Sequence, residues 1–413
     1  MTRYVTLGEL IKTISKTHKF DKDELIFLNT SDVLEGKILI NYYSPVSELK
    51  GQAKKTIQNG DILYSEIRPK NRRYAFVKNL LNPDDYVVST KLMVLRNTSK
   101  NLDTDYLYHF LTWEDTINYL QRKAENRIGS FPQITFDVLK KLQVRLPELN
   151  EQQKIAKILS DLDLKIELNN KINTELEAMA KTLYDYWFVQ FDFPDANGKP
   201  YKTSDGKMVW NEVLKRDIPE VWEVKKLGKV LKTHLGGTPS TKVEKYWKGN
   251  IPWMDSGEVA NFPLINTYQK ISQEAIDNSS TKLLKEGSVL LSITRHLRVN
   301  ILGIDACINQ SIAGIEENDI FKKSYIYFSV LNDIDRLMNL RTGAQQPHIN
   351  KKIVDDSPFI LPKESVLEKY YHIAAPIFDK IISCAKQNQE LTSLRDWLLP
   401  MLMNGQVKVR EDN

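Results

Sequence analysis

The sequence predicts an α+β protein that is built twice, with two similar globular domains of mixed helix and strand and a pair of long helices packed together. Three observations support this prediction. Short β-type runs alternate with helical patterns in two large blocks, motifs recur in the same order about 215 residues apart, and a stretch of heptad-like sequence follows each block. The predicted segments are residues 1–147 (first globular domain), 148–188 (central long helix), 189–362 (connector and second globular domain) and 363–413 (second long helix and tail).

The composition is that of a globular chain with two or three cores. It has 413 residues, of which 41% are hydrophobic. It contains no run of 18 apolar residues, and its first residues lack the apolar region of a signal peptide. Cys307 and Cys384 are too few for a disulfide framework or a four-cysteine zinc site. We therefore expect a cytoplasmic protein in which both cysteines are reduced packing residues.

The two blocks contain short strand-like runs bounded by Gly, Pro, Asn or Asp. These runs are residues 61–65, 86–90, 92–95 and 288–292. Helical patterns cover residues 105–120 and 325–340, and residues 191–219 are rich in turn formers. Each block is therefore expected to mix strands and helices, with a turn-laden connector before the second.

Several motifs recur at a nearly constant offset. Residues 60–68 (GDILYSEIR) return as residues 287–295 (GSVLLSITR), and residues 132–134 (PQI) return as residues 347–349 (PHI). The Leu-Pro pair at residues 146–147 recurs at residues 361–362, and the opening residues 5–10 resemble residues 224–229. A period near 215 residues is too long for a solenoid, so it indicates a duplicated unit.

Each Leu-Pro pair precedes a heptad seam. Its members are Ile155, Leu159, Leu162, Ile166, Asn173, Leu176 and Leu183 in the first copy, and Ile377, Ile381, Asn388, Leu391 and Leu398 in the second. The seams predict an intramolecular helix pair, parallel or antiparallel, about 60 Å long. Asn173 and Asn388 occupy equivalent positions, where paired polar residues would fix the register. The alternative, a core helix of a larger domain, explains the recurrence less well.

Positive charge is concentrated in the globular blocks. The net charge of +5 divides into +6 for residues 1–147, −3 for residues 148–188, +2 for residues 189–362 and zero beyond. This distribution is typical of polyanion-binding domains joined by protein-binding spacers.

The sequence lacks the motifs of several enzymes. It has no Pro-Pro, so the Asp/Asn-Pro-Pro-aromatic loop of amine methyltransferases is missing, and it has no GxxxxGK[ST] loop for ATP. The six histidines show no metal-ligand spacing. We therefore expect no catalytic residues and no metal bound by this chain.

One nuclease-like pattern is an alternative. Asp195 follows Pro194, and Asp205 and Lys207 follow further on, which fits loosely the two carboxylates and lysine of metal-dependent DNA cleavage. Because these residues lie in the turn-rich connector, a surface hairpin is the favoured interpretation.

A basic cluster follows the strand-like run in each copy. Its residues are Arg68, Lys70, Arg72, Arg73 and Tyr74 in the first copy, and Arg295, His296 and Arg298 in the second. Loops of this kind lay Arg and Lys along phosphates, and some side chains reach base edges. The alternative is a solvated surface loop.

A second repeated loop precedes each Leu-Pro pair. It offers Gly for close backbone approach and amides that can bind adenine. Its candidate residues are Arg127 and Gln133 in the first copy, and Arg341, Gln345, Gln346 and His348 in the second. An equally good interpretation is a turn that merely introduces the next strand.

These motifs resemble a known family. Residues 60–69 (GDILYSEIRP), the GSFPQI loop at residues 129–134 and the LPELNEQQKI run at residues 146–155 are similar to the DNA specificity subunit of type I restriction-modification systems. The resemblance covers nearly the whole chain in duplicated order. The second copy departs from it, because residues 364–368 lack the Glu-Gln-Gln helix start and Arg295 is followed by His rather than Pro.

The resemblance implies a non-catalytic protein from a bacterium or archaeon. Each globular domain would read one half of a split DNA target in the major groove, and the helix pair would set the spacer. Two methyltransferase subunits would dock on the helices and bring S-adenosylmethionine to adenines, while motor and nuclease subunits would supply ATP- and Mg-dependent restriction. Trp187 and Trp397, near the helix ends, would serve helix packing rather than subunit docking. The competing classes are a stand-alone Mg-dependent nuclease and a structural protein that binds no DNA.

Overall fold

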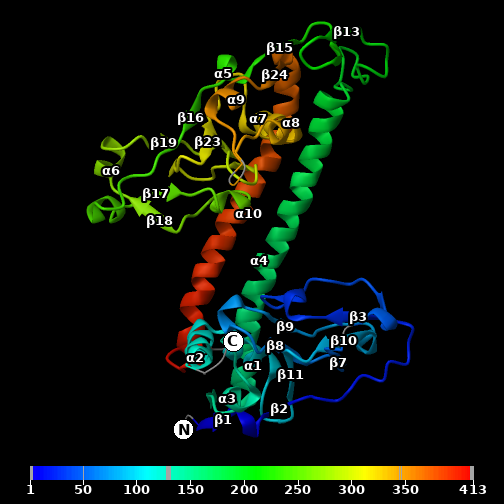
Figure 1. The fold of residues 1–413 in the computed structure, drawn as a ribbon, viewed down its shortest axis with the longest axis vertical. Coiled ribbons are helices and arrows are strands. Elements are labelled where there is room, and N and C mark those ends of the chain that lie inside the picture. Colours follow the sequence, from blue (N-terminus) through cyan, green and yellow to red (C-terminus); the bar gives the residue numbers. More distant parts are fainter. Residues whose placement is uncertain (1–2, 50, 127–131, 344, 346, 410–413) are drawn as a thin grey trace. The chain divides into compact units, whose positions relative to one another are not determined.

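The computed structural model describes residues 3–49, 51–126, 132–343, 345 and 347–409. The chain forms two compact units. Unit 1 comprises Met1–Leu164 and Thr392–Asn413, and unit 2 comprises Lys165–Leu391. Each long helix therefore contributes one part to each unit (Figure 1). The division between the two units therefore falls inside both long helices.

Unit 1 contains two four-stranded sheets. The first has the order β2-β11-β8-β9 and is antiparallel, and the second has the order β6-β3-β10-β7 with β3 parallel to β10. Their strands are β2 (Ile11–Thr13), β11 (Leu92–Asn97), β8 (Ile62–Ser65), β9 (Tyr74–Phe76), β6 (Ser44–Pro45), β3 (Glu24–Leu28), β10 (Tyr86–Ser89) and β7 (Ala53–Lys55). Two further pairs join β1 (Arg3–Thr6) to β12 (Gln143–Leu146), and β4 (Val33–Leu34) to β5 (Lys37–Ile38).

Unit 2 repeats this topology. Its sheets have the orders β16-β23-β20-β21 and β18-β17-β22-β19, again with one parallel pair, β17 and β22. The strands are β16 (Thr233–Leu235), β23 (Ile312–Ile315), β20 (Val289–Ser292), β21 (Val299–Ile301), β18 (Gln269–Ile271), β17 (Ile251–Met254), β22 (Ala306–Ile308) and β19 (Leu283–Leu284). The pair of β15 (Glu223–Lys226) and β24 (Pro358–Leu361) matches β1 and β12. The predicted duplication is confirmed, and all four predicted runs are strands.

The central strands are apolar because both of their faces are buried. In β8, Ile62 and Tyr64 join the core formed with the helices of unit 1, whereas Leu63 joins the core between the two sheets. In β20, Val289 and Leu291 face the helices and Leu290 faces the second sheet. The alternation of side chains along a strand thus ties each sheet to two cores.

The shorter predicted helices are each broken in two. Residues 105–120 form α1 (Thr104–Thr112) and α2 (Glu114–Glu125), separated by Trp113 in an extended conformation. Residues 325–340 form α7 (Lys323–Asn332) and α8 (Ile334–Asn339), with the Asp333 carboxylate bound to Arg336 at 2.6 Å. In both cases the helical pattern is interrupted at a single residue. The structure also contains the short α-helices α3 (Phe136–Leu139), α5 (Leu227–Val230), α6 (Gln273–Asp277) and α9 (Lys351–Asp355).

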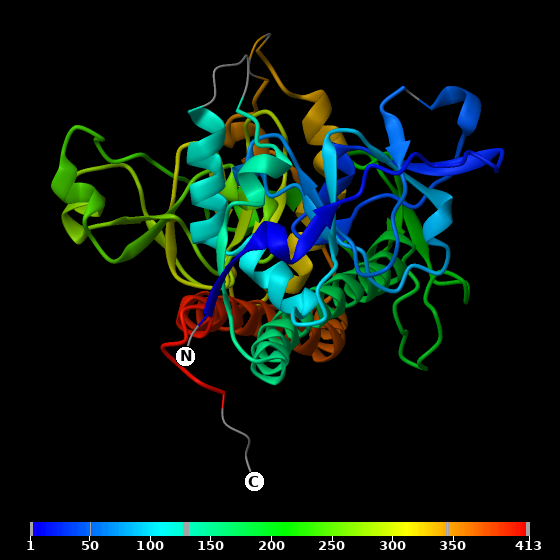
Figure 2. The same ribbon diagram turned by 90° about the horizontal axis from the view of Figure 1, so that it is seen from below.

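The two long helices are confirmed. They are α4 (Leu149–Tyr184), which continues as a π-helical turn over Asp185–Val189, and α10 (Glu364–Met403). Within each unit their segments run antiparallel. Asp163 accepts a bond from Arg395 at 2.8 Å in unit 1, and Asn169 donates to Asn388 at 2.8 Å in unit 2. Figure 2 shows the two helices side by side.

The predicted seam residues are at least partly buried, and one prediction about them needs a correction. Ile155, Leu159 and Ile381 are buried, and the other predicted members are partly buried. However, the two equivalent asparagines do not meet. Asn388 bonds Asn169 and Asn170, whereas Asn173 donates to the carbonyl of Ile381 at 3.2 Å. Antiparallel pairing is the reason, since it places Asn388 opposite a residue one helical turn before Asn173.

The two cysteines and Trp187 take buried structural positions, whereas Trp397 does not, so the expectation that Trp397 serves helix packing is wrong. Cys307 and Cys384 are free and buried. Trp187 is buried against Tyr370, with ring centroids 5.9 Å apart, whereas Trp397 is 56% exposed. Among the described residues, no helix is long and apolar enough to span a membrane.

Candidate nucleic-acid interface

The two loops predicted to bind DNA meet in unit 1. One loop follows β8 and the other precedes α3. The amide of Arg68 donates to the carbonyl of Pro132 at 3.1 Å, and the amide of Ile134 donates to the carbonyl of Glu66 at 2.8 Å. The loops, about 65 residues apart in the sequence, thus form one surface element.

Unit 2 has the same arrangement. The amide of Arg295 donates to the carbonyl of Pro347 at 2.8 Å, and the amide of Ile349 donates to the carbonyl of Ile293 at 3.0 Å. Arg68 and Arg295, the equivalent residues, both have positive φ angles of 43° and 55°. Two residues without glycine's freedom therefore adopt the left-handed conformation at the same turn, which is held by the backbone bonds around it.

Two basic side chains of the unit 1 loop face solvent. Arg68 and Lys70 are both exposed. The amide of Lys70 donates to Oε1 of Gln121, a buried residue of α2, at 3.2 Å. The helix thus fixes the backbone of the loop and leaves both cationic groups outside.

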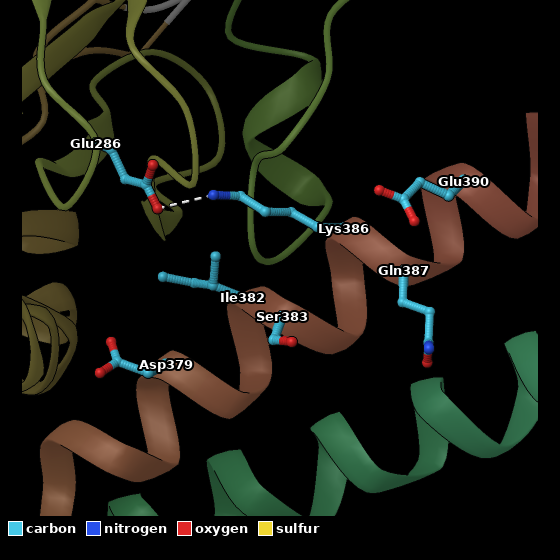
Figure 3. A pocket seen from close by; sticks show the side chains of 7 residues that line it. All are labelled: Glu286, Asp379, Ile382, Ser383, Lys386, Gln387 and Glu390. Carbon is cyan, nitrogen blue, oxygen red and sulfur yellow. Dashed lines mark hydrogen bonds and ion pairs between the residues drawn. The ribbon is translucent and has the colours of Figure 1, made fainter.

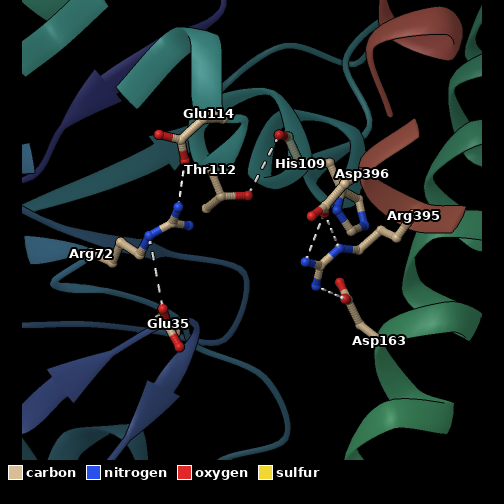
Figure 4. A network of polar contacts seen from close by, with 8 residues as sticks. All are labelled: Glu35, Arg72, His109, Thr112, Glu114, Asp163, Arg395 and Asp396. Carbon is tan, nitrogen blue, oxygen red and sulfur yellow. Dashed lines mark hydrogen bonds and ion pairs between the residues drawn. The ribbon is translucent and has the colours of Figure 1, made fainter. Parts of the chain in front are cut away.

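The next two predicted residues, Arg72 and Arg73, have partners within the protein. The guanidinium of Arg72 contacts Glu114 and lies 3.9 Å from Glu35 (Figure 4). Arg73 donates to the carbonyls of Ser31 and Val33 at 2.9 and 3.3 Å. Arg72 and Arg73 therefore organise the loop rather than project from it.

Tyr74 does not belong to the surface. It is 4% exposed and stacks on Tyr64 with ring centroids 5.8 Å apart, and burial raises its pKa. The prediction that it contacts DNA is wrong, because it is the first residue of β9 and its ring enters the core below the sheet.

Gln133 belongs to a polar group that includes two residues missed by sequence reasoning. Its Nε2 donates to Oε2 of Glu66 at 2.6 Å, and Nζ of Lys91 lies 4.0 Å from the same oxygen. Burial lowers the pKa of the nearby Lys55, which donates to the carbonyls of Thr90 and Leu92. The sequence does contain a feature that points to Glu66, since this residue lies within the repeated run, two residues before Arg68.

In unit 2 the predicted residues after β20 are exposed. Arg295, His296 and Arg298 all face solvent. The hydroxyl of Ser292 donates to the carbonyl of His296 at 2.6 Å and accepts from the amide of Arg298 at 2.9 Å. This short turn therefore holds all three side chains outward.

The second loop of unit 2 contributes one supporting residue and two exposed ones. Arg341 donates from Nη1 to the carbonyl of Arg295 at 2.8 Å, so it supports the first loop. Gln345 and His348 are exposed. Arg127 and Gln346 lie outside the described residues. Gln310 is exposed in the turn beside Ile293, whose amide donates to the carbonyl of Ser311, and its Oε1 accepts from the hydroxyl of Thr238.

A polar network in unit 1 holds α1 against the long helices. His109 lies 3.1 Å from the hydroxyl of Ser160, and burial lowers its pKa to about 4. Arg395 bridges Asp163 and Asp396 at 2.8 and 2.9 Å (Figure 4). All these groups have partners within the protein, so the network is a structural joint.

A cavity of about 510 Å³ in unit 2 lies along α10 (Figure 3). It is lined by Glu286, Asp379, Ile382, Ser383, Lys386, Gln387 and Glu390, and Lys386 pairs with Glu286 at 2.9 Å. Ser383 has no histidine beside it in this lining, so the cavity does not combine a serine nucleophile with a histidine general base.

The nuclease-like residues do not assemble. Asp195 accepts from the amides of Asn197 and Lys199 at 2.7 and 2.9 Å, which closes a turn. Lys207 pairs with Glu220 instead of a carboxylate of the pattern. Over the described part of the chain, no group of three or more His, Cys, Asp or Glu side chains could hold a metal ion.

The duplicated domain corresponds to a known class of DNA specificity domains. The family described as the type I restriction modification DNA specificity domain matches residues 2–178 and again residues 219–393. The chain belongs to this family of specificity subunits, whose members are non-catalytic parts of restriction-modification enzymes.

Similar proteins agree with this assignment. The HindI specificity subunit of Haemophilus influenzae is 31% identical, with 97% of this chain and 98% of the relative covered. The MjaIX specificity subunit of Methanocaldococcus jannaschii is 28% identical over 75% of this chain and 70% of the relative. The crystal structure of the S subunit from M. genitalium has the same fold, with a TM-score of 0.55, 15% identity, and coverage of 98% and 96%.

Proposed function

We propose that this chain directs a type I restriction-modification complex to a bipartite DNA target, with one half read by the domain of each unit. The observation that carries the proposal is the repeated loop pair. In both units the same backbone bonds join two loops and leave cationic side chains exposed, Arg68 and Lys70 in one and Arg295 and Arg298 in the other. Cations at a loop surface bind phosphates, and the neighbouring amides and imidazoles suit base edges in the major groove.

The long helices are the proposed site for two methyltransferase subunits. Leu168 and Met179 lie on the same side of α4, three helical turns apart, and are 50% and 59% exposed. Large exposed apolar residues on one helix face favour a protein partner. In this proposal S-adenosylmethionine, ATP and Mg belong to the methyltransferase and motor-nuclease subunits, and this chain supplies only recognition.

The helix pair is the proposed determinant of the spacer between the two half-targets. In unit 2 the register of the helix pair is specified by hydrogen bonds of a buried side-chain amide. Asn169 is 1% exposed, and its Nδ2 donates to both Gln387 and Asn388 at 2.8 Å. An amide inside an apolar interface penalises other registers, because they would leave it unpaired. Deleting two turns from either helix is expected to change the spacer, and an unchanged spacer would contradict this role.

The test of the main proposal is to map methylated adenines in DNA exposed to this chain co-expressed with its methyltransferase partner. We expect methylation at one split sequence. Affinity for DNA should fall steeply with salt, because each neutralised phosphate releases counterions. A flat salt response would favour the structural alternative, and cleavage of DNA by the purified chain with Mg²⁺ would favour the nuclease.

Exchange of residues 1–147 for those of a relative tests modular recognition. We expect the exchange to alter one half-target only. Loss of specificity in both halves would contradict independent reading by the two domains.

A further inference from the structure

We propose that Gln133 reads an adenine in the half-target bound by unit 1, and that Glu66 is a positioning residue that orients the Gln133 amide. This inference rests on the proposed function. It adds the base that Gln133 recognises, and it gives a role to Glu66, which is not among the DNA-binding residues predicted from the sequence.

The two residues are held together by both backbone and side chains. Ile67 and Gln133 form an antiparallel bridge, and the amide of Ile134 donates to the carbonyl of Glu66 at 2.8 Å. The side chains meet at 2.6 Å between Gln133 Nε2 and Glu66 Oε2. Only 19% of the Glu66 side chain is exposed, so it supports Gln133 from below the surface.

The carboxylate determines which way the amide points. An ionised carboxylate only accepts hydrogen bonds, so the amide nitrogen of Gln133 must face Glu66. Gln133, which is partly exposed, then retains one N–H and its Oε1, and neither is bonded to another residue in the described part of the chain. One donor beside one acceptor is the complement of adenine, which offers N7 and the N6 amino group in the major groove.

Unit 2 lacks this arrangement. The residues equivalent to Glu66 and Gln133 are Ile293 and His348, and the amide of Ile349 makes the matching backbone bond to Ile293. The backbone platform is therefore common to both units, whereas the carboxylate-oriented amide belongs to unit 1. His348 provides a matched control position.

The experiment selects bound duplexes from a randomised DNA library. It uses the full chain assembled with its methyltransferase subunits, at one fixed salt concentration. For Gln133→Ala we expect the preference for adenine to fall about ten- to hundredfold at one position of one half-target, with the other positions unchanged. His348→Ala should leave that half unchanged, and Lys70→Ala should lower binding equally for all sequences.

The isosteric variant Glu66→Gln tests the positioning role separately. Its new amide can donate to Gln133 Oε1, which would turn both N–H groups of Gln133 outward. Two donors complement guanine N7 and O6, so the position should change from adenine alone to adenine or guanine. A residue with a merely structural role would not alter the base preference.

The outcomes separate this inference from the proposed function. The inference would be overturned if Gln133→Ala weakened binding equally for all DNA sequences, or if Glu66→Gln left the base preference unchanged. The proposed function would stand in either case. Failure of the wild-type complex to select any sequence would overturn the proposed function itself. If Gln133→Ala does not fold, the base preference of Glu66→Gln alone decides whether the inference stands.

Discussion

The two units attach their domains to the long helices in different ways. In unit 1 the joint is polar. Gln152, fully buried, donates to the carbonyls of Asn101 and Pro147 at 2.9 and 2.8 Å and accepts from the amide of Asp103 at 2.9 Å. These bonds tie the start of α4 to the loop before α1.

In unit 2 the corresponding joint is aromatic. Phe188 lies 4.8 Å from Tyr325 and 4.9 Å from Tyr370, measured between ring centroids in edge-to-face geometry. The residue equivalent to Gln152 is Leu367, which is 1% exposed. In unit 2 the hydroxyl of Tyr371, one helical turn further on, makes matching bonds. It accepts from the amide of Lys322 at 3.1 Å and donates to the carbonyl of Ile320 at 3.0 Å, so a tyrosine takes over the role of the glutamine. The same topology therefore tolerates two chemistries at its joint.

The largest expected effect is on the aromatic joint. Phe188→Ala removes a buried ring and should lower the free energy of unfolding of unit 2 by about 3–5 kcal/mol, through lost transfer energy and the cavity left behind. Hydrogen exchange of α7 measures this directly. Tyr186→Ala, in the same turn but 37% exposed, should cost much less. Equal effects of the two variants would show that the rings do not form the joint.

The polar joint should be sensitive to acid. His109 has a pKa of about 4 in the folded state, below its unfolded value near 6.5. The folded state therefore favours the neutral ring, and stability is lost as pH falls from about 6.5 towards 4, by at most about 3 kcal/mol. The free energy of unfolding of the wild type minus that of His109→Asn, measured across this pH range, isolates the contribution of the His109 ring. A pH-independent difference would refute it.

Loss of the buried glutamine is the next expected effect. Gln152→Ala leaves an amide and two carbonyls without their partner, so we expect unit 1 to lose about 2–3 kcal/mol. Gln152→Leu, which copies unit 2, should not restore stability because the backbone groups stay unpaired. Denaturant unfolding compares both with Gln153→Ala, a change at the exposed neighbour. Full stability of Gln152→Leu would mean that the two joints are interchangeable.

The smallest expected effect concerns support of the DNA loop in unit 2. Arg341→Ala removes the bond to the carbonyl of Arg295 and should weaken binding to one half-target by about 1 kcal/mol. Binding to duplexes that carry either half alone measures the effect. Weakening of both halves would contradict a local role for Arg341.

Sequence reasoning succeeded where the signal was local or repeated. The duplicated strands, the long helices and the exposed positions of Arg68, Lys70 and Arg295 follow from turn residues, apolar patterns and recurrence. It failed at Tyr74, because one residue's direction at the start of a strand depends on where that strand pairs. It also missed Glu66, whose importance depends on Gln133, 67 residues away.

The sequence by itself determined the family, the twofold repeat, the α+β class and the two long helices, because periodicity and recurrence are properties of the chain. Only the tertiary structure decided the antiparallel direction of the helices, the partners of Asn173 and Asn388, and the choice between polar and aromatic joints. Those features arise from contacts between residues distant in the sequence. Such contacts depend on geometry in three dimensions, which no local pattern of side chains encodes.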